Sequence, residues 1–232
     1  MAGAARKGRR AFAGILFDVD GVLVDSEAFI AEAAAAMFAE FFGIVVDVAE
    51  FSPFVGTGEG RYLCGVAEAR GLAIDIAKAK ERTYELYFKV IRGRLREVAG
   101  ATDLVRACRK AGVRTAIATS ADKKKLDANL AEIGLLESDF DAIVTGLDVE
   151  RKKPFPDIYL EAARRIGLDA RDCLVVEDAI SGIEAGKAAG ATCAGIATTF
   201  PAERLSDAGA VRTFLDLREL SSFALGSEGE SR

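Results

Sequence analysis

Short apolar runs alternate with longer amphipathic segments through the second half of the sequence, and this alternation constrains the fold more than any other feature. A strand buried on both faces reads as a continuous apolar run, whereas a surface helix repeats its apolar residues with a helical period. The apolar runs lie at 13–17, 113–118, 142–144, 173–176 and 192–197, with a short candidate at 211–214, and amphipathic segments separate them at 102–111, 123–133, 156–166 and 179–189. The pattern predicts an α/β fold, a doubly wound, Rossmann-like parallel sheet with helices on both faces.

Between the first apolar run and Gly100, the sequence carries helical patterns and no strand pattern. Helices are expected at 28–42, 59–70 and 74–92. We therefore predict a small α-helical cap domain inserted after the first strand. The predicted boundaries are a core at 12–25 and 99–222, a cap at 26–98, and flexible tails at 1–11 and 223–232.

Histidine is absent from the chain, and its absence excludes several chemistries. Ser-His-Asp and Cys-His nucleophiles, phosphohistidine intermediates and histidine-ligated metals all need an imidazole. Acid–base work therefore falls to carboxylates, lysine, tyrosine or cysteine. The formal net charge of −5 and the pI near 5.1 argue against a surface that binds nucleic acid.

The four cysteines are far apart and form no C-x-x-C pair, which favours a reducing compartment over a disulfide scaffold or a zinc site. No run approaches the roughly 18 apolar residues of a membrane span. The basic segment 1–10 lacks the apolar centre of a secretory signal, and it is interpreted as a solvated tail, a cloning remnant or the stub of an organelle transit peptide. We expect a soluble monomer of the cytoplasm or the plastid stroma.

Polar side chains with complementary chemistry follow several of the predicted strands. In chain order they are Asp18 and Asp20, Thr119 and Ser120, Lys153, and Glu177 and Asp178. Each has a structural alternative: a strand-end turn for the first pair, a solvated charge for Lys153, and helix caps for Thr119 and the last pair. Because the carboxyl ends of parallel strands share one edge of a sheet, we expect these side chains to meet in one cleft.

This combination suits phosphoryl transfer assisted by a metal. A carboxylate can attack phosphorus to form an aspartyl-phosphate. A second carboxylate can protonate the leaving oxygen and then activate water. A lysine and a hydroxyl complete the electrostatic cradle for the phosphoryl oxygens. Mg²⁺ tolerates a few carboxylate ligands together with water and phosphate, so the predicted cofactor is Mg²⁺ and the predicted partner is a small phosphorylated metabolite.

The order and spacing of these motifs resemble the haloacid dehalogenase superfamily from about residue 12 to 220. The segment DVDGV at 18–22 is similar to its D-x-D-G first motif, and Thr119, Lys153 and the pair at 177–178 stand at its second, third and fourth motifs. The helical insertion at 26–98 matches the small cap of this superfamily.

The resemblance implies a role for each of these residues. Asp18 is the implied nucleophile and Asp20 the implied acid/base. Mg²⁺ is implied to bind Asp18, the backbone carbonyl of Asp20 and Asp178, with Glu177 beside it. Phosphate contacts are expected from Gly21, Thr119, Ser120 and Lys153.

Within the superfamily, the sequence is most similar to the β-phosphoglucomutase/CbbY-like branch. The segments FVGTGE at 54–59, SADK at 120–123 and DANL at 127–130 also resemble the phosphatase-like domain of plant chloroplast suppressor-of-quenching proteins, which points to a plastid. The mutase branch has a histidine where this chain has Ile30, and a cap arginine where it has Gly58, with Arg61 nearby. Both differences count against a mutase. Asp20 counts against a dehalogenase, because a dehalogenase protonates no alcohol.

Three functions remain open. The favoured one is a Mg²⁺-dependent phosphatase that hydrolyses a small organic phosphate monoester through an aspartyl-phosphate. The alternatives are a sugar-phosphate mutase of the β-phosphoglucomutase type and a regulatory domain with little activity. In each case, substrate selection is expected from the cap residues Thr57, Gly58, Glu59 and Arg61.

Overall fold

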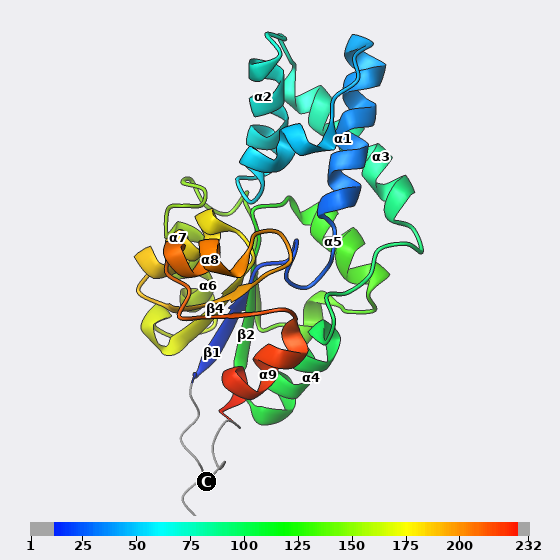
Figure 1. Ribbon diagram of the computed structural model, residues 1–232. Coiled ribbons are helices and arrows are strands. Elements are labelled where there is room, and N and C mark those ends of the chain that lie inside the picture. The colour runs from blue at the N-terminus through cyan, green and yellow to red at the C-terminus, as the bar shows by residue number, and fades with distance from the viewer. Residues whose placement is uncertain (1–11, 227–232) are drawn as a thin grey trace, which may run out of the picture.

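The computed structural model describes residues 12–226, so the tail predicted at 1–11 and residues 227–232 lie outside the described residues. Six parallel strands form one sheet in the order β3-β2-β1-β4-β5-β6. They are β1 (Gly14–Phe17), β2 (Arg114–Ala118), β3 (Ala142–Val144), β4 (Cys173–Glu177), β5 (Thr192–Ile196) and β6 (Arg212–Phe214). The chain proceeds outward from β1 first in one direction and then in the other, so the predicted doubly wound α/β fold is confirmed (Figure 1).

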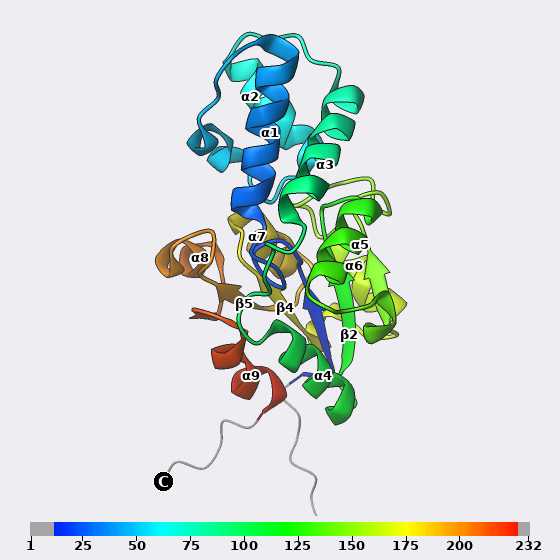
Figure 2. The same cartoon turned by 90° about the vertical axis from the view of Figure 1, so that its right-hand side faces the viewer.

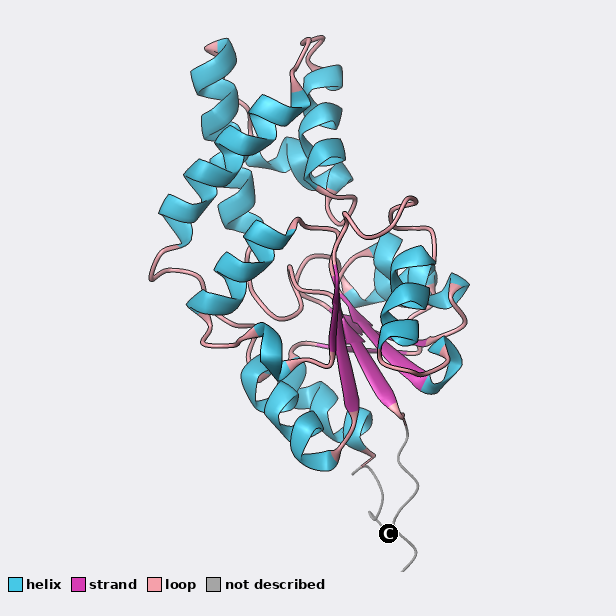
Figure 3. Cartoon of the chain, turned by 180° about the vertical axis from the view of Figure 1, so that it is seen from behind, coloured by secondary structure: helices cyan, strands magenta, loops and turns pink. Residues whose placement is uncertain are grey.

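Helices cover both faces of this sheet (Figure 3). One face packs against α4 (Ala101–Ala111), α5 (Lys123–Glu132) and α9 (Leu217–Leu225), and the other against α6 (Asp157–Arg165), α7 (Ile180–Ala188) and α8 (Ala202–Ala208). Short 3-10 helices lie at Glu137–Asp139 and Ala170–Asp172. Ile15 and Phe17 point into the first layer and Leu16 into the second, because side chains alternate along a strand. All three are fully buried, which explains the unbroken apolar run in the sequence.

Two core helices, α8 and α9, were not predicted from the sequence. The expectation of a flexible tail from residue 223 is wrong for its first residues, since α9 continues to Leu225. The ring of Phe223 lies 5.7 Å from the rings of both Phe12 and Phe214, so the last of the described residues pack against the first. The carboxylate of Asp216 caps the helix by accepting hydrogen bonds from two backbone N–H groups.

The cap domain stands over the carboxyl edge of the sheet and consists of α1 (Glu27–Phe42), a 3-10 helix at Val48–Phe54, α2 (Glu59–Ala69) and α3 (Ile76–Ile91) (Figures 1 and 2). The three α-helices begin and end close to the predicted positions. Aromatic packing joins α1, the 3-10 helix and α2: the rings of Phe51 and Tyr62 stack at 4.8 Å, and Phe38 of α1 lies 6.1 Å from Phe51. Within residues 12–226, no helix has both the length and the apolar character that crossing a bilayer requires.

Polar contacts join the cap to the core around α5. They are Lys80 to Asp122 at 2.7 Å, Tyr87 to Asn129 at 2.6 Å, Ser120 to the Gly56 carbonyl at 3.3 Å, and Lys125 to Glu59 at 3.2 Å. Each contact has one partner in residues 26–98 and the other between 120 and 129. Helix α5 and the loop before it are therefore a part of the core that holds the cap.

Lys125 is the most buried charged group among these contacts, with 3% of its side chain exposed. Its ammonium lies 2.8 Å from Asp20 in the core and 3.2 Å from Glu59 in the cap, so one cation serves a carboxylate from each domain. Burial by itself lowers the pKa of the Lys125 ammonium, but the charges of Asp20 and Glu59 raise that pKa well above its usual value. Lys125 therefore stays charged, and both carboxylates depend on it.

We predict that Lys125→Met lowers the free energy of unfolding by about 3 kcal/mol, because it leaves two buried carboxylates without their cation. Lys124→Met is the matched control: Lys124 is the exposed neighbour on the same helix. Urea unfolding measures both. Removing one uncompensated charge as well, in the Lys125→Met/Glu59→Gln double variant, should restore part of the loss. Equal stabilities of the two single variants would contradict this account of the interface.

Candidate active site

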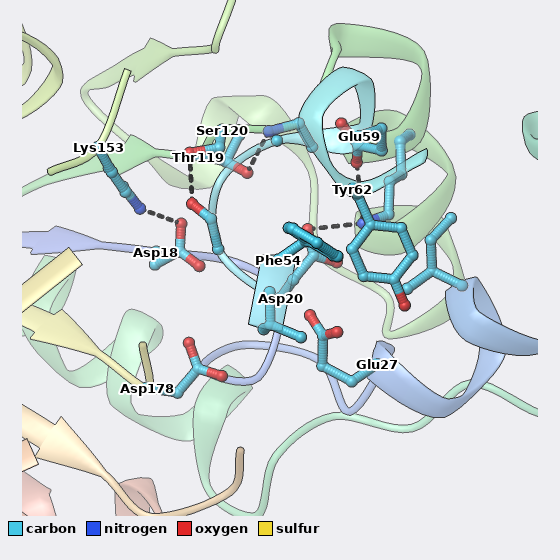
Figure 4. A pocket seen from close by; sticks show the side chains of 16 residues that line it. Asp18, Asp20, Glu27, Phe54, Glu59, Tyr62, Thr119, Ser120, Lys153 and Asp178 are labelled. Atoms are coloured by element: carbon cyan, nitrogen blue, oxygen red, sulfur yellow. Dashed lines mark hydrogen bonds and ion pairs between the residues drawn. The ribbon is translucent and has the colours of Figure 1, made fainter. Parts of the chain in front are cut away.

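The polar residues predicted at the strand ends converge above the centre of the sheet. Phe17 is in register with Ile117 of β2 and with Val176 of β4, so the residues that follow these strands emerge side by side. They border a pocket between core and cap that encloses about 470 Å³, including space open to solvent. We call it the cap–core pocket (Figure 4). Eight predicted site residues line it: Asp18, Asp20, Gly58, Glu59, Thr119, Ser120, Lys153 and Asp178.

Lys153 links two of the strand ends by ion pairs. Its ammonium lies 2.7 Å from Asp18 Oδ1 and 2.6 Å from Glu177 Oε1, with 1% of the lysine side chain exposed. Burial alone lowers the pKa of Lys153, but the charges of Asp18 and Glu177 raise that pKa above its usual value. A permanent positive charge is thus fixed beside the carboxylate of Asp18.

Glu177 lies behind this pair and is fully buried. Its Oε1 accepts hydrogen bonds from Lys153 and from the hydroxyl of Tyr159, at 2.6 and 2.7 Å. Its Oε2 accepts from the next two backbone N–H groups, at 2.9 and 3.0 Å. These four donors occupy both oxygens of the Glu177 carboxylate. Its role is to hold the Lys153 side chain in place.

Three donors hold the carboxylate of Asp20 in place. Its Oδ1 accepts hydrogen bonds from Ser26 at 2.5 Å and from Asn129 at 3.0 Å, and its Oδ2 pairs with Lys125. Asn129 in turn contacts Tyr87 of the cap. Because Lys125 and Asn129 are one helical turn apart on α5, a single helix face positions this side chain.

Three carboxylates form a group that fits a metal ion. Oxygens of Asp18, Glu177 and Asp178 all lie within 4.8 Å of one another, and Asp178 Oδ2 is buried without a hydrogen-bond partner. Burial raises the pKa of Asp18 to about 8 despite the opposing charge of Lys153. Burial together with the charges of Glu177 and Asp18 raises the pKa of Asp178 well above its usual value. Crowded, buried oxygen ligands of this kind are what a hard divalent cation stabilises.

Gly21 makes this arrangement possible. Its φ is +76°, and a Cβ at this position would lie 1.9 Å from Asp178 Oδ2. The loop that carries Asp18 and Asp20 can therefore approach the Asp178 carboxylate only with glycine here. The role of Gly21 in the structure is to admit a neighbouring side chain, and it does not line the pocket.

The cap residues predicted to select the substrate divide into two groups. Gly58 and Glu59 line the pocket, whereas Thr57 and Arg61 do not. The hydroxyl of Thr57 donates to a backbone carbonyl at 2.6 Å. The guanidinium of Arg61 pairs with Glu68 at 2.7 Å and lies 5.1 Å from the ring of Phe54, with half of its side chain exposed.

Further residues in the pocket were not predicted as site residues. They include Glu27, Phe54, Tyr62 and Lys125. Of these residues, Lys125 could have been recognised as buried from the sequence, because it shares a helical face with the apolar Leu126 and Leu130. That face, which also includes Asn129, is buried in the structure. Lys123 and Lys124 of the same basic run lie off that face.

We predict that Gly182→Ala displaces the carboxylate of Glu177, on the side of the site away from the pocket. A Cβ at position 182 would lie 1.7 Å from Glu177 Oε1, so the carboxylate that holds Lys153 must move. The free energy of unfolding should fall by about 1–3 kcal/mol, as in other overpacked cores. Gly60→Ala is the control, because its Cβ would meet nothing closer than 3.8 Å. Urea unfolding measures both variants, and a Gly182→Ala protein as stable as wild type would contradict the prediction.

Comparison with known proteins gives consistent matches. A family model described as haloacid dehalogenase-like hydrolase matches residues 12–190. Protein SUPPRESSOR OF QUENCHING 1, chloroplastic, of Arabidopsis thaliana is 42% identical over 198 residues, which cover 84% of this chain and 19% of that protein. Validoxylamine A 7'-phosphate phosphatase of Streptomyces hygroscopicus subsp. limoneus is 31% identical over 194 residues, covering 83% of this chain and 89% of the relative. This chain thus corresponds to about a fifth of the Arabidopsis relative and to most of the bacterial one.

Solved structures agree. The crystal structure of CbbY from Rhodobacter sphaeroides in complex with phosphate has a TM-score of 0.80 at 27% identity and covers 90% of this chain and 96% of its own. The matched family region contains the first strand, the cap and all four strand-end motifs. The chain belongs to the haloacid dehalogenase-like hydrolases.

Proposed function

We propose that the chain is a Mg²⁺-dependent phosphatase that hydrolyses a small organic phosphate monoester through an aspartyl-phosphate on Asp18. One observation carries this proposal: the carboxylate of Asp18 lies in the pocket, with the fixed ammonium of Lys153 on one side and the unpartnered oxygen of Asp178 close by. Such a carboxylate is placed to attack a group whose negative charge neighbouring cations neutralise.

The first step forms the phosphoenzyme. An oxygen of Asp18 attacks phosphorus and forms a P–O bond, while the ester P–O bond breaks and its electron pair goes to the leaving oxygen. Asp20, in its protonated carboxyl form and released from Lys125, supplies the proton that this oxygen needs. In the present arrangement three donors hold Asp20, so its side chain must turn from them to reach the leaving group.

The second step returns the enzyme to its initial state. Asp20, now ionised, takes a proton from water as the water oxygen attacks phosphorus, and the bond between phosphorus and Asp18 breaks. Inorganic phosphate leaves and the Asp18 carboxylate is restored. Lys153 and the hydroxyl groups of Thr119 and Ser120 border the pocket where the phosphoryl oxygens would lie, so they can stabilise charge in both steps.

The residues that would hold Mg²⁺ are Asp18, Asp178 and the backbone carbonyl of Asp20. We assign Glu177 an indirect part, because four donors already saturate its oxygens. When bound, the metal supplies positive charge that lets the Asp18 carboxylate and the phosphate dianion approach each other. The raised pKa values of Asp18 and Asp178 support this assignment, since burial first and neighbouring carboxylates second make both groups costly to ionise, and a bound cation offsets that cost.

The relatives support a phosphatase. The Streptomyces relative is by name a phosphatase of a phosphorylated small molecule, and the CbbY structure holds phosphate. A plastid location is supported by the chloroplastic Arabidopsis relative. The structure offers no specific support for a mutase, because Ile30 lines the pocket where that branch has a histidine, and Arg61 is turned away to Glu68.

We predict that Asp18→Asn lowers the rate of 4-nitrophenyl phosphate hydrolysis at least about thousandfold, because an amide is a poor nucleophile. Asp172→Asn is the matched control: Asp172 is exposed and precedes β4 at the opposite edge of the sheet. It should keep wild-type activity. Both proteins should show wild-type circular dichroism. Activity of Asp18→Asn within tenfold of wild type would exclude the proposed nucleophile.

We predict that Mg²⁺ raises the melting temperature of the wild-type protein and that EDTA abolishes both this shift and the activity. At a hundredfold excess over Kd, binding adds about 2.7 kcal/mol to the free energy of unfolding. Sodium chloride of equal ionic strength controls for screening.

Asp178→Asn sharpens the same test. It should lose most of the Mg²⁺-dependent shift, yet in EDTA it should melt no lower than wild type, since it removes a carboxyl group that burial and the charges of Glu177 and Asp18 make costly to ionise. A variant that keeps the full shift would show that the cation binds elsewhere.

A further inference from the structure

The carboxylate of Asp20, the proposed acid/base, is restrained by contacts that continue into the cap. Besides the hydroxyl of Ser26, the donors are Lys125 and Asn129 of α5, at 2.8 and 3.0 Å, and only 14% of the Asp20 side chain is exposed. Lys125 and Asn129 each have a second partner, and both second partners belong to the cap. Asp20 is therefore the core end of two bridges that join the cap to the core.

The first bridge runs through Asn129, which is fully buried. The ionised carboxylate of Asp20 only accepts hydrogen bonds, so the NH₂ group of the Asn129 amide must face it. The amide oxygen then faces the hydroxyl of Tyr87 on α3, which donates to it at 2.6 Å. Because Tyr87 fixes the orientation of the Asn129 amide, it also fixes one of the donors that restrain Asp20.

The second bridge runs through Lys125. Its ammonium is shared between Asp20 and Glu59 of α2, at 2.8 and 3.2 Å. Glu59 thus offsets part of the positive charge that would otherwise act on Asp20 alone. The ring of Tyr87 lies 5.5 Å from the same ammonium, so the two bridges lie next to each other in the interface.

We propose that the docked cap restrains the acid/base: Tyr87, through Asn129, holds Asp20 in the position seen here, from which Asp20 must be released before it can protonate a leaving group. Tyr87 is then a positioning residue, since it acts through Asn129 and does not line the pocket. Glu59 has the opposite effect, because it competes with Asp20 for Lys125. This inference rests on the proposed phosphatase function and adds the way in which the cap controls its proton transfer.

The leaving group of the substrate reports how freely Asp20 gives its proton. Phenolate is a stronger base than 4-nitrophenolate, so phenyl phosphate depends on the acid more than 4-nitrophenyl phosphate does, and the two esters are close in size. The value of kcat/KM covers the steps up to the loss of the phenol. The quantity to measure is therefore the ratio of kcat/KM for phenyl phosphate to that for 4-nitrophenyl phosphate, with Mg²⁺ present.

Tyr87→Phe keeps the ring but loses the hydroxyl, so the Asn129 amide can turn and Asp20 is released more easily. The ratio should rise about threefold to fivefold, which is the factor that one hydrogen bond allows, even though the melting temperature should fall. Tyr84→Phe is the matched control: Tyr84 lies on the same helix, is 1% exposed, and has no hydrogen-bond partner for its hydroxyl among the described residues. It should leave the ratio unchanged.

Glu59→Gln tests the second bridge and should move the ratio in the other direction. It leaves the charge of Lys125 to Asp20 alone, so the ratio should fall about threefold or more. A general loss of packing would lower activity toward both esters in both variants. Opposite shifts of the ratio therefore distinguish a restraint on Asp20 from a structural role.

The outcomes separate this inference from the function on which it rests. A wild-type protein without Mg²⁺-dependent aryl phosphatase activity would overturn both. With that activity present, an unchanged or lower ratio in Tyr87→Phe would overturn the restraint by Tyr87. An unchanged or higher ratio in Glu59→Gln would overturn the competition for Lys125, and this comparison tests the restraint by the cap even if Tyr87→Phe does not fold.

Discussion

The buried ammonium of Lys153 is the interaction on which the site depends. It follows β3 in the chain, yet it binds the carboxylates that end β1 and β4, and these strands are neighbours at the centre of the sheet. Removing Lys153 would leave two buried carboxylates without their cation, which costs far more than a surface pair contributes. Two further residues support the Glu177 carboxylate. Tyr159 donates a hydrogen bond to it, and Gly182 has no side chain where a Cβ would collide with it.

Much of the fold could be predicted because it depends on local periodicity. Buried parallel strands and amphipathic helices leave patterns in the sequence, and the carboxyl-edge rule then brought Asp18, Thr119, Lys153 and Asp178 to one pocket. The helices α8 and α9 escaped prediction because they are short and polar on much of their surface. What holds the end of α9 is the packing of Phe223 against Phe12, a contact between the two ends of the described chain that no local pattern encodes.

Side-chain direction within the cap could not be predicted for a related reason. Arg61 and Tyr62 are adjacent on α2, about 100° apart around the helix axis, and only the docking of the helix decides which one faces the core. The stacking of Tyr62 on Phe51 fixes that rotation, so Tyr62 enters the pocket and Arg61 turns to Glu68. Lys125 shares a helical face with Leu126 and Leu130, which is a local signal of burial. Its carboxylate partners, Asp20 and Glu59, lie far away in sequence and could not be predicted.

The charged groups that line the cap–core pocket differ between its core side and its cap side. On the core side of the pocket, carboxylates outnumber cations, which a divalent metal would offset, and burial raises the pKa of the Asp18 carboxyl to about 8. On the cap side, one lysine, Lys125, pairs with both Asp20 and Glu59, and a third carboxylate, Glu27, also lines the pocket. A phosphate there would meet carboxylates without a free cation. The charges that line the pocket therefore favour a phosphate on the core side, beside Asp18 and Lys153.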